Sequence, residues 1–321
     1  MNRRATRQDD LAFRLATGVF GVVIVAIVAA IAVELARQSM PTIQKFGLNF
    51  WRTDIWDPIA GEFGALPFIW GTLYSSILAM LIATPIALGI AIFVAELAPV
   101  PLQRPLVFLT ELLAAIPSIV YGLWGMFVLV PAVRSIENGM PDVLRQLPFF
   151  SGPARGVGML SAALILAIMV VPFTSSVARE VLKSVPNAQR EGAYALGATR
   201  LEAIRAALFY ARTGIVGAVM LGFGRALGET MAVTMVIGND PKITVSLFAP
   251  QYTMAAVLAN EFSEAADPLH LSALVEIGLV LFTITLVVNM LSRLLIWSMA
   301  RSARGPAAAA AAEVAAEVAA A

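Results

Sequence analysis

The sequence predicts an all-α integral membrane protein with six transmembrane helices. Hydrophobic residues make up 59% of its 321 residues and charged residues only 13%, and the mean hydropathy is +0.83. Soluble domains are about 45–50% apolar and about 25% charged. A helix needs about 20 apolar residues to cross a hydrocarbon core of about 30 Å. Runs of that length occur at 13–36, 66–97, 105–132, 157–178, 213–237 and 271–299.

The two ends of the chain differ from the apolar runs between them. Three arginines lie among the first seven residues, as they do in a secretory signal. The run at 13–36 is longer than the apolar region of about 7–15 residues in a signal peptide, so we expect a retained helix after a cytoplasmic segment at 1–12. Residues 305–321 are rich in alanine, which favours helix but is only weakly apolar. We expect a cytoplasmic tail there, after a single transmembrane domain at 13–304.

Lysine and arginine are distributed unevenly between the connecting segments. If the N-terminus is cytoplasmic, the inner segments carry 14 of these residues and the outer segments carry 7, while Arg225 lies inside the fifth run. Loops rich in lysine and arginine stay in the cytoplasm. The charge distribution therefore predicts that both termini are cytoplasmic and that 38–65, 134–156 and 239–269 face outward.

Several kinds of chemistry are excluded or disfavoured by composition. The net charge of +1 does not favour a nucleic-acid partner, and the chain has no cysteine. The single histidine, His270, cannot build a metal site from imidazole ligands, so we expect an ordinary residue at the membrane interface. Glu111 and Glu276 are isolated acids that we expect to snorkel or to pair locally. We expect no metal site, no catalytic residue and no cofactor bound by this chain.

The cytoplasmic segment at about 180–212 reads as a folded element. Ser184 is a candidate N-cap for a first helix, and Gly197 can end that helix with a left-handed backbone. Thr199 and Glu202 have the T-x-x-E spacing of a capping box that opens a second helix. An amphipathic helix pair lying on the lipid and a docking element for a soluble partner both fit this pattern.

The fifth apolar run contains a cation and an anion. Arg225 lies 12 residues after Thr213, about 18 Å into the membrane, where an arginine costs about 2.5–3.5 kcal/mol unless it faces water or a partner. Glu229 follows four residues later, on the same face of a continuous helix. Two explanations stay open: a structural ion pair, or a charged lining for the route of an anion. Gly224 and Gly228 form a neighbouring face on which another helix can pack.

The segment "EGAYALGATRLEAIRAALF" resembles the EAA loop of ATP-binding-cassette (ABC) importer permeases, which docks on a cytoplasmic ATPase. Glu191, Gly192 and Ala193 match the E-A-A, and Gly197 matches the glycine that follows. Gly192 replaces the family's alanine, and the family's later proline is absent from "ALFY". Four more segments resemble the PstC-type permeases of phosphate importers: "EFGALPFIWGTLYSS", "PIALGIAIFVAELAP", "AAIPSIVYGLWG" and "GIVGAVMLGFGRALGETMAV".

This resemblance implies a type I ABC importer permease fold in a bacterial inner membrane. The chain would form half of a phosphate pathway beside a PstA-type permease, with Arg225 and Glu229 lining the route. A dimer of ATPase subunits would dock at the loop, and a phosphate-binding protein would deliver the substrate from outside. ATP and Mg²⁺ would act on the ATPase, since the chain has no G-x-x-x-x-G-K-[ST] motif.

Alternatives to a phosphate permease remain at this stage. Sulfate or molybdate would suit the same cation, and a secondary transporter or channel could use Arg225 as an ion site. A membrane enzyme is disfavoured because the sequence has no zinc motif and no nucleophile elbow. The outer aromatic residues Phe50, Trp51 and Trp56 suit either a membrane-interface belt or contact with a binding protein.

Overall fold

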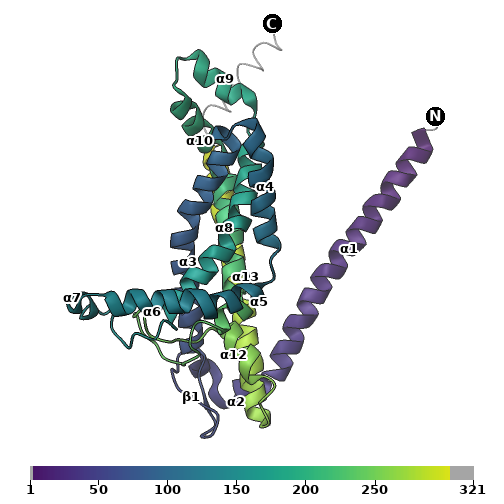
Figure 1. Cartoon of the computed structure of the whole chain (residues 1–321). Coiled ribbons are helices and arrows are strands. Elements are labelled where there is room, and N and C mark those ends of the chain that lie inside the picture. The colour runs from purple at the N-terminus through teal and green to yellow at the C-terminus, as the bar shows by residue number, and fades with distance from the viewer. Residues whose placement is uncertain (1–2, 304–321) are drawn as a thin grey trace.

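The structure is a computed structural model that describes residues 3–303 (Figure 1). The predicted alanine-rich tail at 305–321 lies outside the described residues. In the first half of the chain the elements are α1 (Arg3–Gln38), α2 (Met40–Phe46), the 3₁₀ turn η1 (Gly47–Trp51), β1 (Trp56–Asp57), β2 (Glu62–Phe63), α3 (Leu66–Ile92), the π-helical turn η2 (Phe93–Leu97), α4 (Val100–Ala115), α5 (Ser118–Trp124), the π-helical turn η3 (Gly125–Leu129), α6 (Val130–Gly139) and α7 (Asp142–Arg145). They are followed by α8 (Met159–Lys183), α9 (Asn187–Ala195), α10 (Arg200–Leu227), α11 (Met231–Thr234), α12 (Met254–Glu261) and α13 (Pro268–Ala303).

The predicted all-α membrane fold is confirmed. Within residues 3–303, six helical segments are long and apolar enough to cross a membrane: Phe13–Gln38, Leu66–Leu97, Ser118–Gly139, Met159–Lys183, Arg200–Leu227 and Pro268–Met299. Figure 1 shows α3, α4, α8, α10 and α13 running along one bundle, with α9 beyond one end and the short elements around β1 and α12 at the other. Helix α1 leans away from this bundle, and none of its most apolar stretch is buried.

The predicted single helix at 105–132 is wrong, because α4, α5, η3 and the start of α6 share this range. Helix α4 ends at Ala115, and Ile116 and Pro117 are extended before α5 begins. A proline disfavours α-helical backbone at the residue before it and has no amide hydrogen of its own. Figure 1 shows the consequence: α4 runs along the bundle, whereas α5 and α6 run across it.

The predicted helix at 213–237 is also wrong at both ends. Helix α10 begins at Arg200, so the second helix of the cytoplasmic loop and the fifth span are one helix of 28 residues. It ends at Leu227, with Gly228 as its C-cap. After the short helix α11, the chain continues without a helix to Thr253.

Much of this non-helical segment, 235–253, is buried, and its backbone groups find partners elsewhere. The amides of Gly158 and Leu160, at the start of α8, donate to the carbonyl oxygens of Val236 and Leu247 at 3.0 and 2.7 Å. Side chains of α3 donate as well: Trp70 Nε1 to the Thr244 carbonyl and the Tyr74 hydroxyl to the Val245 carbonyl. Irregular backbone at membrane depth is stable only when protein or water satisfies it. These bonds meet that condition.

Helix α8 lies at the centre of the bundle, in close contact with α10. A Cβ at Gly222 would lie 2.3 Å from the Thr174 hydroxyl oxygen, and one at Gly214 would lie 2.5 Å from Val181 Cγ1. Ala218, midway between the two glycines, is buried. Gly214, Ala218 and Gly222 follow one another at intervals of four residues, which is the spacing that lets helix backbones approach closely. This seam joins α8 to α10.

The packing predicted for Gly224 and Gly228 is not made within the described chain. A Cβ at Gly224 would meet only Asn289 Oδ1, at 4.0 Å, and one at Gly228 would meet only the carbonyl oxygen of Gly224, at 3.9 Å. No other helix of the described chain packs closely on this pair. The same four-residue spacing of small residues occurs earlier in α10, at Gly214, Ala218 and Gly222, and these residues pack on α8.

At the end of the bundle away from α9, a cluster of aromatic residues joins the β1–β2 hairpin to α13. His270 stacks on Phe63 with ring centroids 5.4 Å apart, and its Nε2 lies 3.3 Å from Glu261 Oε2. The same carboxylate accepts a hydrogen bond from Trp56 Nε1. His270 is 9% exposed and Phe50 is fully buried, so both belong to the protein core here. The position predicted for His270 at the membrane interface stays a prediction, and the structure adds that its side chain is buried.

Candidate functional site

Arg225 lies in the last turn of α10, on a face that this chain leaves uncovered. Leu221, one turn earlier on the same face, is 54% exposed, and Arg225 and Gly228 are exposed as well. The guanidinium carbon lies 5.5 Å from the centroid of the Phe173 ring on α8. A cation is favoured over an aromatic face and at the negative end of a helix dipole. The side chain is thus held near α8, and no carboxylate of the described residues pairs with its hydrogen-bond donors.

Glu229 lies just after the end of α10, beside the start of α11. Its Oε1 accepts a hydrogen bond from the Ala232 amide, at 3.4 Å, where α11 begins. Among the described residues no ion pair joins Glu229 to Arg225. The prediction of a shared helical face is wrong because α10 ends at Leu227, before the helix can reach Glu229. The two charges are close in sequence, but each has its own partner.

The predicted helix–turn–helix is confirmed at the Gly197 turn. The amides of Gly197 and Ala198 donate to the carbonyl oxygens of Tyr194 and Ala193, at 2.9 and 3.1 Å, and so form a Schellman motif. Gly197 has φ +81°, in the left-handed region that glycine tolerates without strain. We therefore attribute the glycine to its backbone conformation, since a Cβ there would meet no atom within 4 Å.

Of the two helix caps predicted for this loop, one is present and the other is not. The capping box between Thr199 and Glu202 is present, with the Thr199 amide donating to Glu202 Oε2 at 2.8 Å. Ser184 does not cap α9: it ends α8, and its hydroxyl donates to the Val181 carbonyl. Helix α9 begins directly after Pro186, whose fixed φ suits the start of a helix.

The face that α9 presents outward includes apolar side chains that sequence reasoning missed. Leu196 is 91% exposed and Tyr194 is 49% exposed, beyond the end of the bundle in Figure 1. Glu191 and Gly192, of the E-A-A match, are exposed beside them, and Ala193 is half-buried. The signal in the sequence is "YALG", apolar residues in an otherwise polar short helix. These side chains leave the face of α9 open to contact with another molecule.

Three residues hold α9 and its turn to the rest of the chain, and none of them was singled out from the sequence as a contact. Arg190 Nη2 lies 2.5 Å from Oε1 of Glu96, in the π-helical turn η2. The Glu96 carbonyl oxygen accepts a second hydrogen bond from Arg200 Nη2, at 2.8 Å. The two bonding residues, Glu96 and Arg190, are 94 positions apart. No local pattern could have revealed this contact.

The two isolated acids behave differently. Glu111 Oε1 lies 3.5 Å from Nη2 of Arg179, a buried residue of α8, so local pairing of Glu111 is confirmed. Glu276 is 2% exposed in α13, and its Oε2 has no hydrogen-bond partner in the part of the chain that the structure describes. For Glu276 the predicted snorkelling or pairing is wrong.

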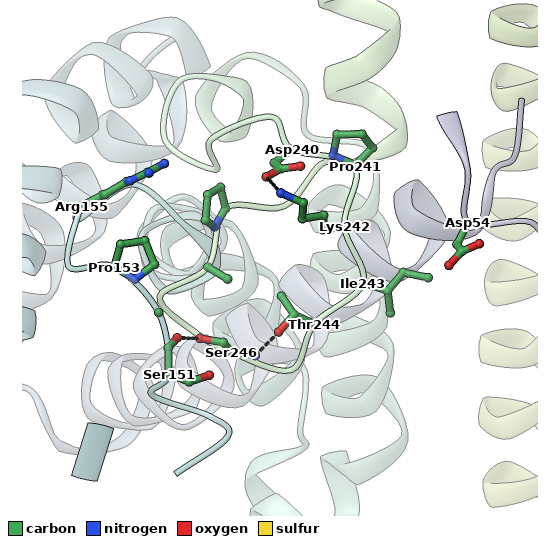
Figure 2. A pocket seen from close by; sticks show the side chains of 13 residues that line it. Asp54, Ser151, Pro153, Arg155, Asp240, Pro241, Lys242, Ile243, Thr244 and Ser246 are labelled. Carbon is green, nitrogen blue, oxygen red and sulfur yellow. Dashed lines mark hydrogen bonds and ion pairs between the residues drawn. The ribbon is translucent and has the colours of Figure 1, made fainter. Parts of the chain in front are cut away.

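A cavity of about 550 Å³ lies among the segments near β1, away from Arg225. Figure 2 shows Arg155 on one side of it and the ion pair between Lys242 Nζ and Asp240 Oδ2, 2.8 Å long, on another. Asp54 and the hydroxyl groups of Ser246 and Thr244 complete its polar lining. Because acidic and basic side chains are balanced here, the cavity does not by itself favour an anion.

Comparison with known proteins defines the class of protein first. A family model described as binding-protein-dependent transport system inner membrane component matches residues 87–301. The chain belongs to this family. A chain of the MetNI methionine ABC transporter, solved in an inward-facing conformation, has the same fold, with a TM-score of 0.55 and 15% sequence identity. That match covers 72% of this chain and 94% of the MetNI chain.

Within this family the chain is similar to proteins described as phosphate transport system permease protein PstC. The protein of Haemophilus influenzae is 48% identical over 293 residues, which cover 89% of this chain and 93% of the relative. The protein of Mesorhizobium japonicum is 44% identical, with coverages of 88% and 89%. A relative from Methanocaldococcus jannaschii, described as a probable PstC, is 40% identical over 260 residues.

Proposed function

We propose that the chain is the permease subunit of an ATP-driven importer of inorganic phosphate in a bacterial inner membrane. It forms half of the translocation pathway beside a second, PstA-type permease. Support comes from its similarity to phosphate permeases and from the uncovered face of α10, which leaves room for a second membrane chain. The observation that carries the proposal is Arg225, a cation in the fifth membrane span that no carboxylate of residues 3–303 neutralises.

Arg225 has the chemistry that a transported oxyanion requires. Its guanidinium is permanently charged and presents forked N–H donors that match the geometry of a phosphate. In this structure the guanidinium lies against the ring of Phe173 and forms no ion pair with an acid of the described residues. A phosphate arriving on the open face of α10 would therefore displace no ion pair.

Glu229 has the opposite function in this proposal. Glu229 lies four residues beyond Arg225. Its carboxylate accepts a hydrogen bond from the Ala232 amide at the start of α11. A negative charge held near the route repels the anion and limits how tightly it is bound. A transport pathway needs this balance because a substrate held too tightly is not released.

The exposed face of α9 is the proposed docking surface for an ATPase dimer. Glu191, Gly192, Ala193 and the Gly197 turn supply the family match, and Tyr194 and Leu196 supply exposed apolar contacts. That ATPase binds ATP together with Mg²⁺ and hydrolyses the ATP. An extracytoplasmic phosphate-binding protein delivers the substrate at the opposite end of the bundle.

Uptake by the assembled importer in proteoliposomes tests the role of Arg225. Arg225→Gln should reduce uptake of labelled phosphate to background with normal amounts of complex, and Arg225→Lys should retain part of it. The matched control is Arg37→Gln, on the exposed end of α1. Glu229→Gln should impair transport without preventing assembly. Native uptake by Arg225→Gln, or uptake of sulfate or molybdate instead of phosphate by the unmodified complex, would overturn the corresponding part of the proposal.

Two single cysteines test the proposed orientation in a chain without native cysteine. Leu196, at the turn after α9, is 91% exposed, and Ile59, near β1, is fully exposed. Each is replaced singly by cysteine. If both termini are cytoplasmic, an impermeant thiol reagent added to intact cells labels position 59 and leaves position 196 unlabelled until the cells are opened. The reverse pattern would contradict the topology.

A further inference from the structure

We infer that Glu96 is the point at which the motion of the coupling loop enters the membrane domain, and that α3 receives this motion together with α10. The inference rests on the proposed function, in which a cytoplasmic ATPase moves α9. Helix α10 follows the loop in sequence and would move with it. The inference adds α3 as a second helix that receives the motion. The carrier is a clamp of three residues, Glu96, Arg190 and Arg200.

Arg190 is the centre of the clamp. Its Nη2 lies 2.5 Å from Glu96 Oε1, and its Nε lies 3.2 Å from both carboxylate oxygens. The same guanidinium donates to the carbonyl oxygens of Val185, at 2.9 Å, and Leu182, at 3.0 Å. Arg190 thereby ties α9 to the end of α8 and to the end of α3 at once. A forked pair with additional acceptors is the strong form of an ion pair.

Burial separates this contact from an ordinary surface ion pair. The Glu96 side chain is 9% exposed and the Arg190 side chain 20% exposed. By contrast, Lys242, which pairs with Asp240 at the cavity near β1, is 73% exposed. Exposed pairs contribute little because water screens them, whereas removing one partner of a buried pair leaves the other charge uncompensated. The clamp therefore persists as α9 moves.

Arg200 closes the clamp from the other side of the turn. Its Nη2 donates to the backbone carbonyl oxygen of Glu96, at 2.8 Å, from the first residue of α10. The helices on both sides of Gly197 thus hold the same residue, one through its carboxylate and one through its backbone. Any displacement of the helix–turn–helix displaces Glu96 with it.

Glu96 lies where α3 can transmit that displacement. It belongs to the π-helical turn η2, which continues α3 and ends where Ala98 becomes extended before Pro99. Single π-helical turns are uncommon and are found frequently at functional sites. Further along α3, Met80 Cε lies 3.6 Å from the position of a Cβ on Gly222. Gly222 is three residues from Arg225, so α3 links the clamp to the proposed anion route.

The ratio of phosphate transported to ATP hydrolysed tests the clamp. In the full complex in proteoliposomes, Glu96→Gln and Arg190→Gln should each lower this ratio at least about fivefold, the low end of typical coupling between sites. Arg200→Gln, which removes one hydrogen bond, should have a smaller effect. Asp240→Asn, which breaks the exposed pair at the outer cavity, is the matched control and should keep the native ratio. A native ratio in Glu96→Gln would overturn the inference.

A covalent replacement separates coupling from structural support. The chain has no cysteine, so the double variant Glu96→Cys, Arg190→Cys can be joined by a short, reducible bifunctional thiol reagent. Joining the cysteines should restore the ratio, reduction should lower it again, and neither single cysteine should respond. A ratio that stays low in the joined variant would overturn the clamp even if Glu96→Gln failed to assemble. Absence of phosphate uptake by the unmodified complex would instead overturn the proposed function.

Discussion

The two ends of the helical bundle connect their helices in opposite ways. Around β1 and α12 the connections are packed into the protein, and segment 235–253 bonds to the start of α8 and to side chains of α3. At the other end no residue of α9 is buried, and the Arg190–Glu96 contact is its strongest attachment to the membrane helices.

This difference separates a rigid end from a movable one. Opening the packed end would expose many backbone groups together, whereas α9 can shift while its own hydrogen bonds stay intact. Segments with few buried contacts are the ones that move at low free energy. Substituting glycine by alanine in each region measures the difference, because the structure gives each glycine a different reason to lack a side chain.

The largest effect is expected from Gly71→Ala at the packed end. A Cβ at Gly71 would lie 2.1 Å from the backbone carbonyl oxygen of Tyr252, so α3 and segment 235–253 must separate. Overpacking of this kind destabilises by about 1–3 kcal/mol and occasionally more, and we expect the upper end of that range. Thermal unfolding of the purified chain in detergent should show a clear fall in the midpoint. Gly89→Ala, on the same helix with no atom within 4 Å, should unfold as the native chain does.

A smaller and more local effect is expected from Gly197→Ala at the movable end. Space is available for the Cβ, but the φ of +81° places it in the left-handed region, which costs other residues about 1–2 kcal/mol. The Schellman turn should loosen, and transport per ATP should fall while the unfolding midpoint of the membrane domain stays near native. A Gly197→Ala complex with native coupling would show that the turn geometry is unimportant for docking.

The smallest effect is expected from Gly192→Ala, one turn before Gly197. No atom lies within 4 Å of its Cβ position, and its backbone has no positive φ. Alanine in a helix is more stable than glycine by about 0.5–1 kcal/mol, so uptake should be unchanged and the loop slightly more stable. Loss of uptake would indicate that position 192 meets the ATPase too closely for a methyl group, which would sharpen the docking surface.

The sequence predicted the span at 66–97 and the glycine turn correctly because both depend on neighbouring residues. It failed where distant residues decide the structure. The end of α10 at Leu227 depends on a non-helical segment whose carbonyl oxygens are satisfied by the amides of Gly158 and Leu160. The break at Pro117 did have a local signal, which the long apolar run outweighed.

The candidate site, too, was predicted correctly where neighbouring residues decide the structure and incorrectly where distant residues decide it. Arg225 was identified from its charge in an apolar run, and its placement on an uncovered face fits that interpretation. The predicted pairing of Arg225 with Glu229 assumed a continuous helix and failed with it. The Glu96–Arg190 contact could not be predicted at all, because ordinary surface and buried charges look alike in a sequence until the fold brings them together.

Because α10 is one helix from the capping box to Arg225, the protein contains a lever without a joint. Its 28 residues span about 42 Å, so a stroke of about 7 Å at the loop end would tilt the helix by about 10° around its packed end. The glycine seam would carry α8 with it, so the ring of Phe173 and the guanidinium of Arg225 would turn together. The length of the helix thus sets the gain: a stroke of several ångströms at the loop becomes a rotation of the residues beside the proposed anion route.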